Sequence, residues 1–345
     1  IKECDWSSDV CSSDLLFDYD NISINFTQSN NASSSGIPGS TGWGNFWERA
    51  PFFQDSDPEN GPSRLFQLGL ISDPTGKLVN FGSRPKFPFF GWDYEPGKRV
   101  PNPNGTSSDN FSQQNSITLA TNRTLFDNIS IQLNWKVNWN YNRNTNLKTD
   151  EFGNINMANS TKTITSDIDR SFIALPDFFL FKLLGAGGIE KVGELYTKAK
   201  ADAGDKRDNT EKFSSAFEEG FEFFPLATKI FGAVAPRVNW SIRWTGLEKL
   251  SFLSQFANTV SLSHAYTSNF TTRFRIIEAG KRITESQRIS FAFNPLIGVD
   301  ISFREIFGGT FSSNVRYTTN GNYDLNTSSE NIIESSAKEI SISAN

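Results

Sequence analysis

The longest regular alternation of apolar and polar residues in this chain runs from Ile129 to Tyr141. A period of two residues places the two sets on opposite faces of a β-strand. The strand exceeds the roughly five or six residues typical of soluble sheets, and it satisfies the roughly 9–11 residues of a tilted membrane strand. We predict that the odd positions face lipid, namely Ile129, Ile131, Leu133, Trp135, Val137, Trp139 and Tyr141. The barrel lumen would be lined from this strand by Gln132, Asn134, Lys136 and Asn138.

The same alternation recurs elsewhere, which predicts an all-β fold built from long antiparallel strands. Clear examples are residues 238–244, 259–270 and 288–303, and shorter candidates are residues 16–27, 64–70, 116–124, 161–173, 310–319 and 338–344. A soluble sandwich with its apolar face inward is the alternative interpretation. The second face carries Asn, Ser and Thr more than Lys and Glu, which favours a transmembrane barrel. Long Gly-, Pro- and aromatic-rich loops between the candidate strands are typical of the extracellular side of such barrels.

Residues 178–234 interrupt the strand pattern and predict a helical insertion between two groups of barrel strands, residues 16–177 and residues 235–345. Apolar residues at helical spacing suggest two helices. The first has Ile189, Val192, Leu195 and Ala199 on one face. The second has a stripe of Phe213, Phe217, Phe221 and Phe224, with Asn209 or Thr210 as the N-cap and Pro225 as the stop. We interpret the phenylalanine stripe as a packing surface rather than a ligand site.

The first fifteen residues are excluded from the fold argument. Residues 5–15, DWSSDVCSSDL, are what a common short-read sequencing adapter encodes, so we expect residues 1–15 not to be native. Without them, Lys plus Arg falls from 33 to 32 and Asp plus Glu from 38 to 34, and the net charge changes from −5 to −2. This near-balance argues against nucleic acid as a partner. Both cysteines, Cys4 and Cys11, are removed as well, which excludes a disulfide framework or a cysteine-based metal site.

Few residues suggest chemistry. Asp55, Asp57 and Glu59 loosely resemble a calcium loop but lack its glycine and its acidic closing residue, so a solvated turn is favoured. His264 is the only histidine, and it has no second histidine or native cysteine with which to share a metal. We predict no catalytic residue, no cofactor and no metal, and therefore no enzyme.

Three stretches in the last third of the chain resemble the C-terminal part of the SprA/Sov family, whose members are giant outer-membrane proteins of type IX secretion and gliding motility. The stretches are PRVNWSIRWTGLEKL, VSLSHAYTSNF and FNPLIGVDISF. The residues that carry the resemblance include Trp240, Gly246, His264, Tyr266, Pro295, Gly298 and Asp300. Before Pro236 the resemblance is diffuse.

The resemblance implies a very large single-chain transmembrane β-barrel in the outer membrane of a Gram-negative bacterium, exposed at the cell surface. It implies a protein-translocation channel whose partners are outer-membrane lipid, secreted cargo, a PorV-type shuttle barrel and a plug protein. The N-terminal bulk and a final strand of such a barrel are expected to be missing, so that the chain is a fragment. The alternatives are another outer-membrane barrel, such as a nutrient receptor or porin, and a secreted β-rich carbohydrate-binding protein.

Overall fold

The computed structural model describes residues 21–39, 43–48, 61–62, 64–68, 77–78, 94–95, 98–102, 104–125, 128–174, 188–204, 206–222, 237–277, 282–305 and 309–345. Most of these residues belong to one antiparallel sheet of nine strands. Its strands are β1 (Asn21–Ser34), β4 (Ser107–Leu125), β5 (Ile129–Leu147), β6 (Thr161–Ser171), β7 (Asn239–Trp244), β8 (Ala257–Ile276), β9 (Arg282–Phe303), β10 (Ser312–Asn326) and β11 (Asn331–Ala344). The predicted all-β class is confirmed.

The remaining elements are short or belong to the insertion. A separate two-stranded sheet pairs β2 (Lys77–Leu78) with β3 (Tyr94–Glu95). The helices are α2 (Trp43–Glu48), α3 (Arg64–Gln67), α5 (Ile189–Ala201) and α6 (Asn209–Phe221), with single 3-10 turns at Met157–Asn159 and Leu247–Lys249. Residues 64–67 were predicted to be part of a strand and are helical instead, because the four-residue helix α3 is fixed by tertiary contacts such as that of Arg64 Nε with the Phe46 carbonyl, 2.6 Å away.

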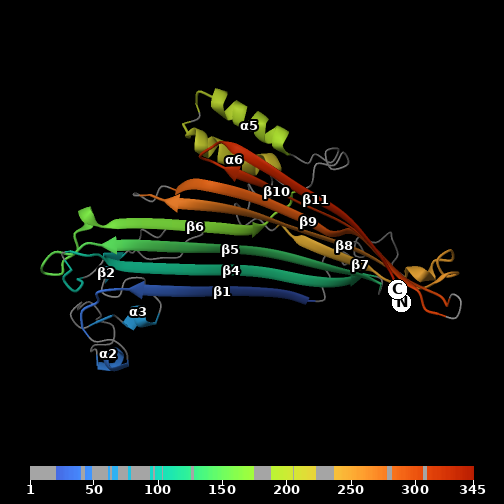
Figure 1. Ribbon diagram of the computed structural model, residues 1–345, viewed down its shortest axis with the longest axis horizontal. Helices are drawn as coiled ribbons and strands as arrows, with labels where there is room; N and C mark the ends of the chain where they lie inside the picture. The colour runs from blue at the N-terminus through green and yellow to red at the C-terminus, as the bar shows by residue number, and fades with distance from the viewer. Residues whose placement is uncertain are drawn as a thin grey trace, which may run out of the picture.

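The strands follow one another across the sheet in the order β1-β4-β5-β6-β8-β9-β10-β11, with β7 also between β5 and β8. Figure 1 shows them as long, nearly parallel ribbons, with the helices α2 and α3 at the opposite end of the sheet from the chain's C-terminus. We call the end that contains Asn21 and Ala344 the terminal end, and the opposite end the distal end. The edge strands β1 and β11 do not pair with each other.

Strands β6 and β7 are two halves of one strand position. Both run antiparallel to β5 and to β8, with β6 on the distal half and β7 on the terminal half. On β5, Val137 pairs with Arg170 and Asn134 pairs with Asn239. Counting along β5 therefore places Asn239 directly after Phe172, and the pairing with β8 gives the same spacing. Residues 173–238 leave the sheet and return to it without changing the register.

The two faces of the sheet differ in chemistry. Paired residues in neighbouring strands share a face, so the strand pairs can be followed as rows. On what we call the apolar face, one row runs through Phe26, Ile117, Val137, Arg170, Phe270, Ile289, Tyr323 and Glu334. On the opposite, polar face, a row runs through Asn138, Asp169, Thr271, Arg288 and Asp324.

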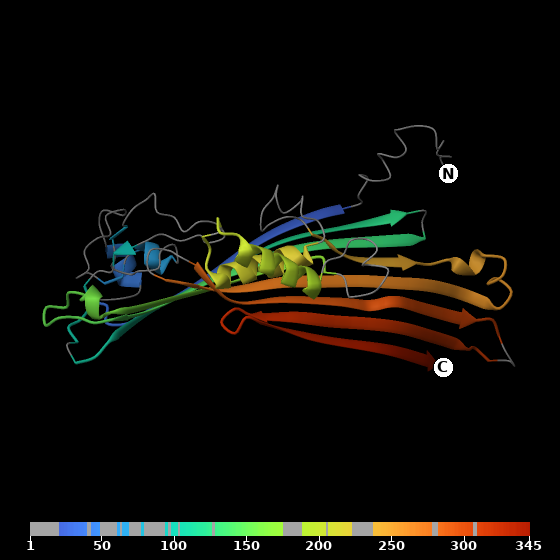
Figure 2. The same ribbon diagram turned by 90° about the horizontal axis from the view of Figure 1, so that it is seen from above.

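Helices α5 and α6 cover part of the apolar face. They pack as a hairpin across the middle of the strands (Figure 2), over residues of β8, β9 and β10. The predicted phenylalanine stripe forms this contact, because Phe213, Phe217 and Phe221 are buried in the main core cluster. Phe224 lies outside the described residues. The N-cap of α6 is Asp208 rather than Asn209 or Thr210, since its carboxylate accepts a hydrogen bond from the Glu211 amide at 2.8 Å.

Candidate functional site

The three stretches that resemble the SprA/Sov family lie side by side in strands β7, β8 and β9. Trp240 of β7 pairs with Tyr266 of β8, and Tyr266 pairs with Phe293 of β9. The rings of Trp240 and Tyr266 are stacked with centroids 4.4 Å apart, and the tilted ring of Phe293 lies 4.8 Å from that of Tyr266. The sheet thus brings together residues from three separate stretches of the sequence. We call this part of the sheet the junction.

A bulge in β9 shapes the centre of the junction. Ser263 pairs with Gly298 and Tyr266 with Phe293, so residues 294–297 lie opposite only residues 264–265. His264 fills this irregularity, with its Nδ1 atom 2.7 Å from the Leu296 carbonyl oxygen. Pro295 packs beside Gly298, where a Cβ atom would lie 2.3 Å from Ser263 Oγ and 2.8 Å from Pro295 Cγ. The close approach of these chains therefore requires glycine at position 298.

Asp300 and Gly246 lie on the terminal side of the junction. The Asp300 carboxylate, on the polar face, accepts hydrogen bonds from Asn314 Nδ2 and from Ser261 Oγ, the latter at 3.4 Å. Gly246 has a φ of 79° and begins the turn between β7 and β8. A cavity of about 630 Å³ next to these residues is lined by side chains of both charges, including Arg243, Glu248, Lys249 and Asp300.

The helical insertion is attached to the sheet at the point where it leaves the split strand. The Tyr266 hydroxyl donates a hydrogen bond to the Ala174 carbonyl at 2.5 Å and accepts one from the Ala174 amide at 2.8 Å. A buried tyrosine hydroxyl needs such a partner, since leaving it unsatisfied would cost free energy. Tyr266 therefore holds the first residues of the insertion against the junction.

Two arginines attach α6 to the two ends of the split strand. Arg170, the second-last residue of β6, forms an ion pair with Glu218 and lies over the Phe270 ring at 4.8 Å. Arg237, two residues before β7, pairs with Glu222, its Nε atom 3.1 Å from Oε1, and lies over the Phe172 ring at 4.9 Å. Glu218 lies in the last turn of α6 and Glu222 is its C-cap residue, so both arginines meet the C-terminal end of this helix.

A further contact ties α5 to the turn between β10 and β11. The Tyr196 hydroxyl donates a hydrogen bond to Glu330 Oε2 at 2.7 Å, and Lys200 Nζ lies 3.5 Å from the same oxygen. The hydrogen bond from Tyr196, assisted by the charge of Lys200, lowers the pKa of the Glu330 carboxyl. Glu330 has a φ of 48°, a strained conformation for a residue with a side chain. The insertion thus contacts both the junction and the far edge of the sheet.

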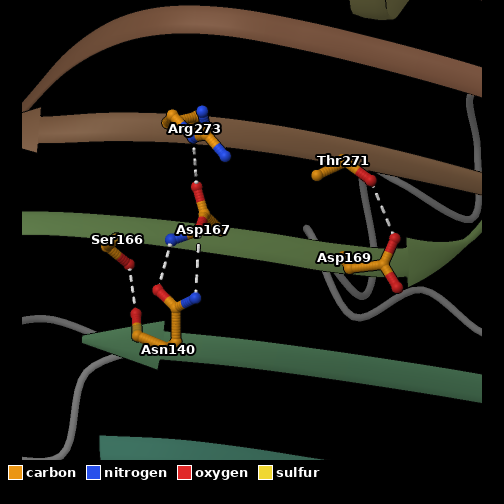
Figure 3. A network of polar contacts seen from close by, with 6 residues as sticks. All are labelled: Asn140, Ser166, Asp167, Asp169, Thr271 and Arg273. Atoms are coloured by element: carbon orange, nitrogen blue, oxygen red, sulfur yellow. Dashed lines mark hydrogen bonds and ion pairs between the residues drawn. The ribbon is translucent and has the colours of Figure 1, made fainter. Parts of the chain in front are cut away.

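The polar face carries a ladder of charged and amide side chains across β5, β6 and β8 (Figure 3). Asp167 accepts hydrogen bonds from Arg273 Nε at 2.9 Å and from Asn140 Nδ2 at 3.0 Å. Asp169 accepts one from Thr271 Oγ1 at 2.9 Å. The ladder continues to β10, where Arg288 of β9 lies 3.4 Å from Asp324. These groups retain solvent access, so this face suits contact with water rather than with hydrocarbon.

Two kinds of feature are absent from the described residues, a metal-binding cluster and a membrane-spanning helix. Among them, no group of three or more His, Cys, Asp or Glu side chains could hold a metal. None of the described helices is long and apolar enough to cross a membrane. Neither the family models nor the curated proteins give a match to this chain. The resemblance to the SprA/Sov family therefore remains a prediction from the residues of the junction.

The structure places the two predicted sets of β5 residues on opposite faces of the sheet. The seven odd positions share the apolar face, and the predicted lumen-facing set shares the polar face. Val137 and Trp139 are only 1% and 2% exposed and pack in a small cluster with Ile168, so other parts of the chain cover them. The assignment of the two sets to lipid and to a lumen stays a prediction.

Sequence reasoning missed the ion pairs that hold the insertion. Arg170 and Arg237 stand at the ends of two strands that look separate in the sequence, and only the register of β5 and β8 shows that they flank one break. The repeated spacing of Glu218 and Glu222 on a helix was the available signal. The acidic stretch at Asp55, Asp57 and Glu59 lies outside the described residues, as do residues 1–15.

Proposed function

We propose that this chain forms part of the wall of a large outer-membrane β-barrel that conducts proteins, as the resemblance to the SprA/Sov translocons implies. In this proposal the polar face lines a water-filled passage and the apolar face is directed outward. The passage would accommodate secreted cargo, and a PorV-type shuttle and a plug protein would be the partners. The chain would carry no catalytic centre.

One observation carries the proposal: at the terminal end of the sheet, an apolar face opposes a polar face at all eight strand positions. The strands are also long, with 19 residues in β5, 20 in β8 and 22 in β9, where about 9–11 suffice to cross a bilayer. In a soluble sandwich the outer face also contacts water, but its apolar face is covered by a second sheet. Here Ile22, Ile24 and Phe26 are more than half exposed on the apolar face.

The proposal is tested by photo-crosslinking in cells of a Gram-negative bacterium that secretes proteins across its outer membrane. A photoreactive amino acid replaces Lys136, on the polar face, or Ile131, on the apolar face of the same strand. We expect crosslinks to secreted proteins from position 136 and none from position 131. Equal crosslinking from both positions, or none from position 136 during active secretion, would contradict a protein-conducting lumen.

A further inference from the structure

The apolar face is not apolar along the whole length of its strands. On β1 the exposed apolar side chains Ile22, Ile24 and Phe26 are followed on the same face by Gln28 and Asn30. On β11 the apolar face carries Ile340 and Ile342 near the terminal end, preceded by Glu334, Ser336 and Lys338. We call the apolar zone at the terminal end of all eight strand positions the belt.

The distal limit of the belt crosses the rows of paired residues obliquely. On β1 the last belt residue is Phe26, and the row that begins at Phe26 ends at Glu334 on β11. The first belt residue on β11 is Ile340, which lies further toward the terminal end. From Glu334 to Ile340 the limit moves by six residues along the strand while it crosses seven strand spacings from β1 to β11. At about 3.3 Å per residue and about 4.8 Å between strands, the limit of the belt makes an angle of about 30° with the rows. Strands of outer-membrane barrels are tilted by a similar angle, about 35–45°, from the barrel axis.

The part of the apolar face beyond the belt is covered by protein. Phe217 of α6 is fully buried against the sheet, with its ring centroid 6.3 Å from that of Phe270. The outer surface of the hairpin exposes charged side chains such as Glu190, Glu194 and Lys198. Charged groups facing hydrocarbon are costly, so this outer surface belongs in water. The helices therefore mark the half of the apolar face that lipid does not reach.

We infer that bilayer hydrocarbon surrounds only the belt, with the membrane surface running obliquely across the rows from Phe26 on β1 to Ile340 on β11. The distal half of the wall and the α5–α6 hairpin, which lies on the outer surface of the wall, project into water. The terminal end carries the connections 126–128, 245–256 and 304–311, and the distal end carries 35–106, 148–160, 277–281 and 327–330. The longest connection, 35–106, is therefore at the distal end. Long connections are typical of the extracellular side of outer-membrane barrels, which places the hairpin outside the cell and the terminal end in the periplasm.

This inference rests on the proposed barrel. Two residues of one row provide a test of the oblique surface that is separate from the test of the barrel. Phe26 and Glu334 occupy the same row and the same face. An oblique membrane surface places position 26 in lipid and position 334 in water, whereas a surface parallel to the rows gives both positions one environment. The full-length barrel that contains this chain, with its other cysteines replaced by serine, is reconstituted into phosphatidylcholine vesicles. A spin label is attached to cysteine at position 26, 334 or 340, or at Ser341 on the polar face.

The measurement is the ratio of collision rates of each label with oxygen, which concentrates in lipid, and with a water-soluble nickel complex. We expect a high oxygen-to-nickel ratio at positions 26 and 340, and a reversed ratio at positions 334 and 341. Equal ratios at 26 and 334, with a high ratio at 340, would overturn the oblique surface while leaving the barrel proposal intact. Low ratios at every position would overturn both.

Discussion

At the residue scale, the most demanding feature of this protein is the burial of two arginines where the insertion leaves the sheet. The side chains of Arg237 and Glu222 are 1% and 6% exposed. Burying two charges costs desolvation free energy, which their mutual attraction offsets only with good geometry and further contacts. Arg237 has such a contact in the Phe172 ring, so the pair specifies where α6 meets the split strand.

The first prediction concerns the loss of one partner from this pair. Glu222→Gln leaves the Arg237 charge buried without its carboxylate, and we expect the hairpin to lose about 3–5 kcal/mol of local stability. Hydrogen exchange of the α6 amides measures this loss. Glu219→Gln is the matched control, since Glu219 is exposed on the same helix and its removal is expected to change exchange by less than about 0.5 kcal/mol. Equal effects of the two substitutions would contradict an anchoring role for Glu222.

What could be predicted from the sequence at this scale follows from periodicity. The alternation from Ile129 to Tyr141 correctly assigned each side chain to one of two faces, because strand geometry alone fixes that assignment. Burial of Val137 and Trp139 could not be predicted, since it depends on segments distant in the sequence. The ion pairs of Arg170 and Arg237 with the end of α6 could not be predicted either, because their partners are also distant in the sequence.

At the element scale, the α5–α6 hairpin depends on a close approach of its two helices. Gly220 of α6 faces Val192 of α5, and a Cβ atom at position 220 would lie 2.4 Å from Val192 Cγ2 and 3.0 Å from its Cα. Gly193 is in the adjacent helix, and a Cβ atom there would meet nothing within 4 Å. The two glycines therefore have the same helix propensity but different surroundings.

The second prediction is that alanine has opposite effects at these two positions. Gly193→Ala gains helix propensity and is expected to stabilise the hairpin by about 1 kcal/mol. Gly220→Ala gains the same propensity but separates the helices. Overpacking costs about 1–3 kcal/mol, so the expected net change is a destabilisation of up to about 2 kcal/mol. Hydrogen exchange of the α5 and α6 amides measures both changes. Stabilisation by both substitutions would show that the helices are not in close contact at Gly220.

The existence of both helices was predictable from their apolar spacing, whereas their contacts were not. Spacing of Phe213, Phe217 and Phe221 on one face predicts a packing surface, and the structure confirms it. The same spacing says nothing about which strands lie beneath. The partners on β8, β9 and β10 are set by the point at which the insertion leaves the sheet.

At the scale of the whole molecule, the insertion interrupts a single strand without disturbing the wall. Phe172 and Asn239 occupy successive positions on both neighbouring strands, so their side chains alternate as in an unbroken strand. Arg170, Phe172 and Trp240 then share the apolar face, while Ser171 and Asn239 share the polar face. Sequence patterns predicted an insertion between two groups of strands, yet only the register shows that it lies within one strand.

The third prediction is that the wall survives removal of the insertion only if this alternation is preserved. Deleting residues 173–238 joins Phe172 directly to Asn239, and we expect the amides of β5 and β8 at the junction to retain their hydrogen-exchange protection. Deleting residues 172–238 removes one residue more and joins Ser171 to Asn239. This shift by one would turn Trp240 to the polar face. The protection of the same amides is then expected to be lost, together with the β-sheet circular dichroism signal of the junction strands.

The two deletions differ by one residue and remove the same helices, so a difference between them reports register rather than the loss of the hairpin. Both uncover the apolar side chains beneath α6, such as Phe270 and Tyr323, and both are expected to bind more of an apolar fluorescent dye than the full chain. Equal protection in the two deletion variants would mean that β6 and β7 pair independently. Retention of the sheet in the first variant alone would establish them as one strand, with the hairpin as an attachment to the apolar face.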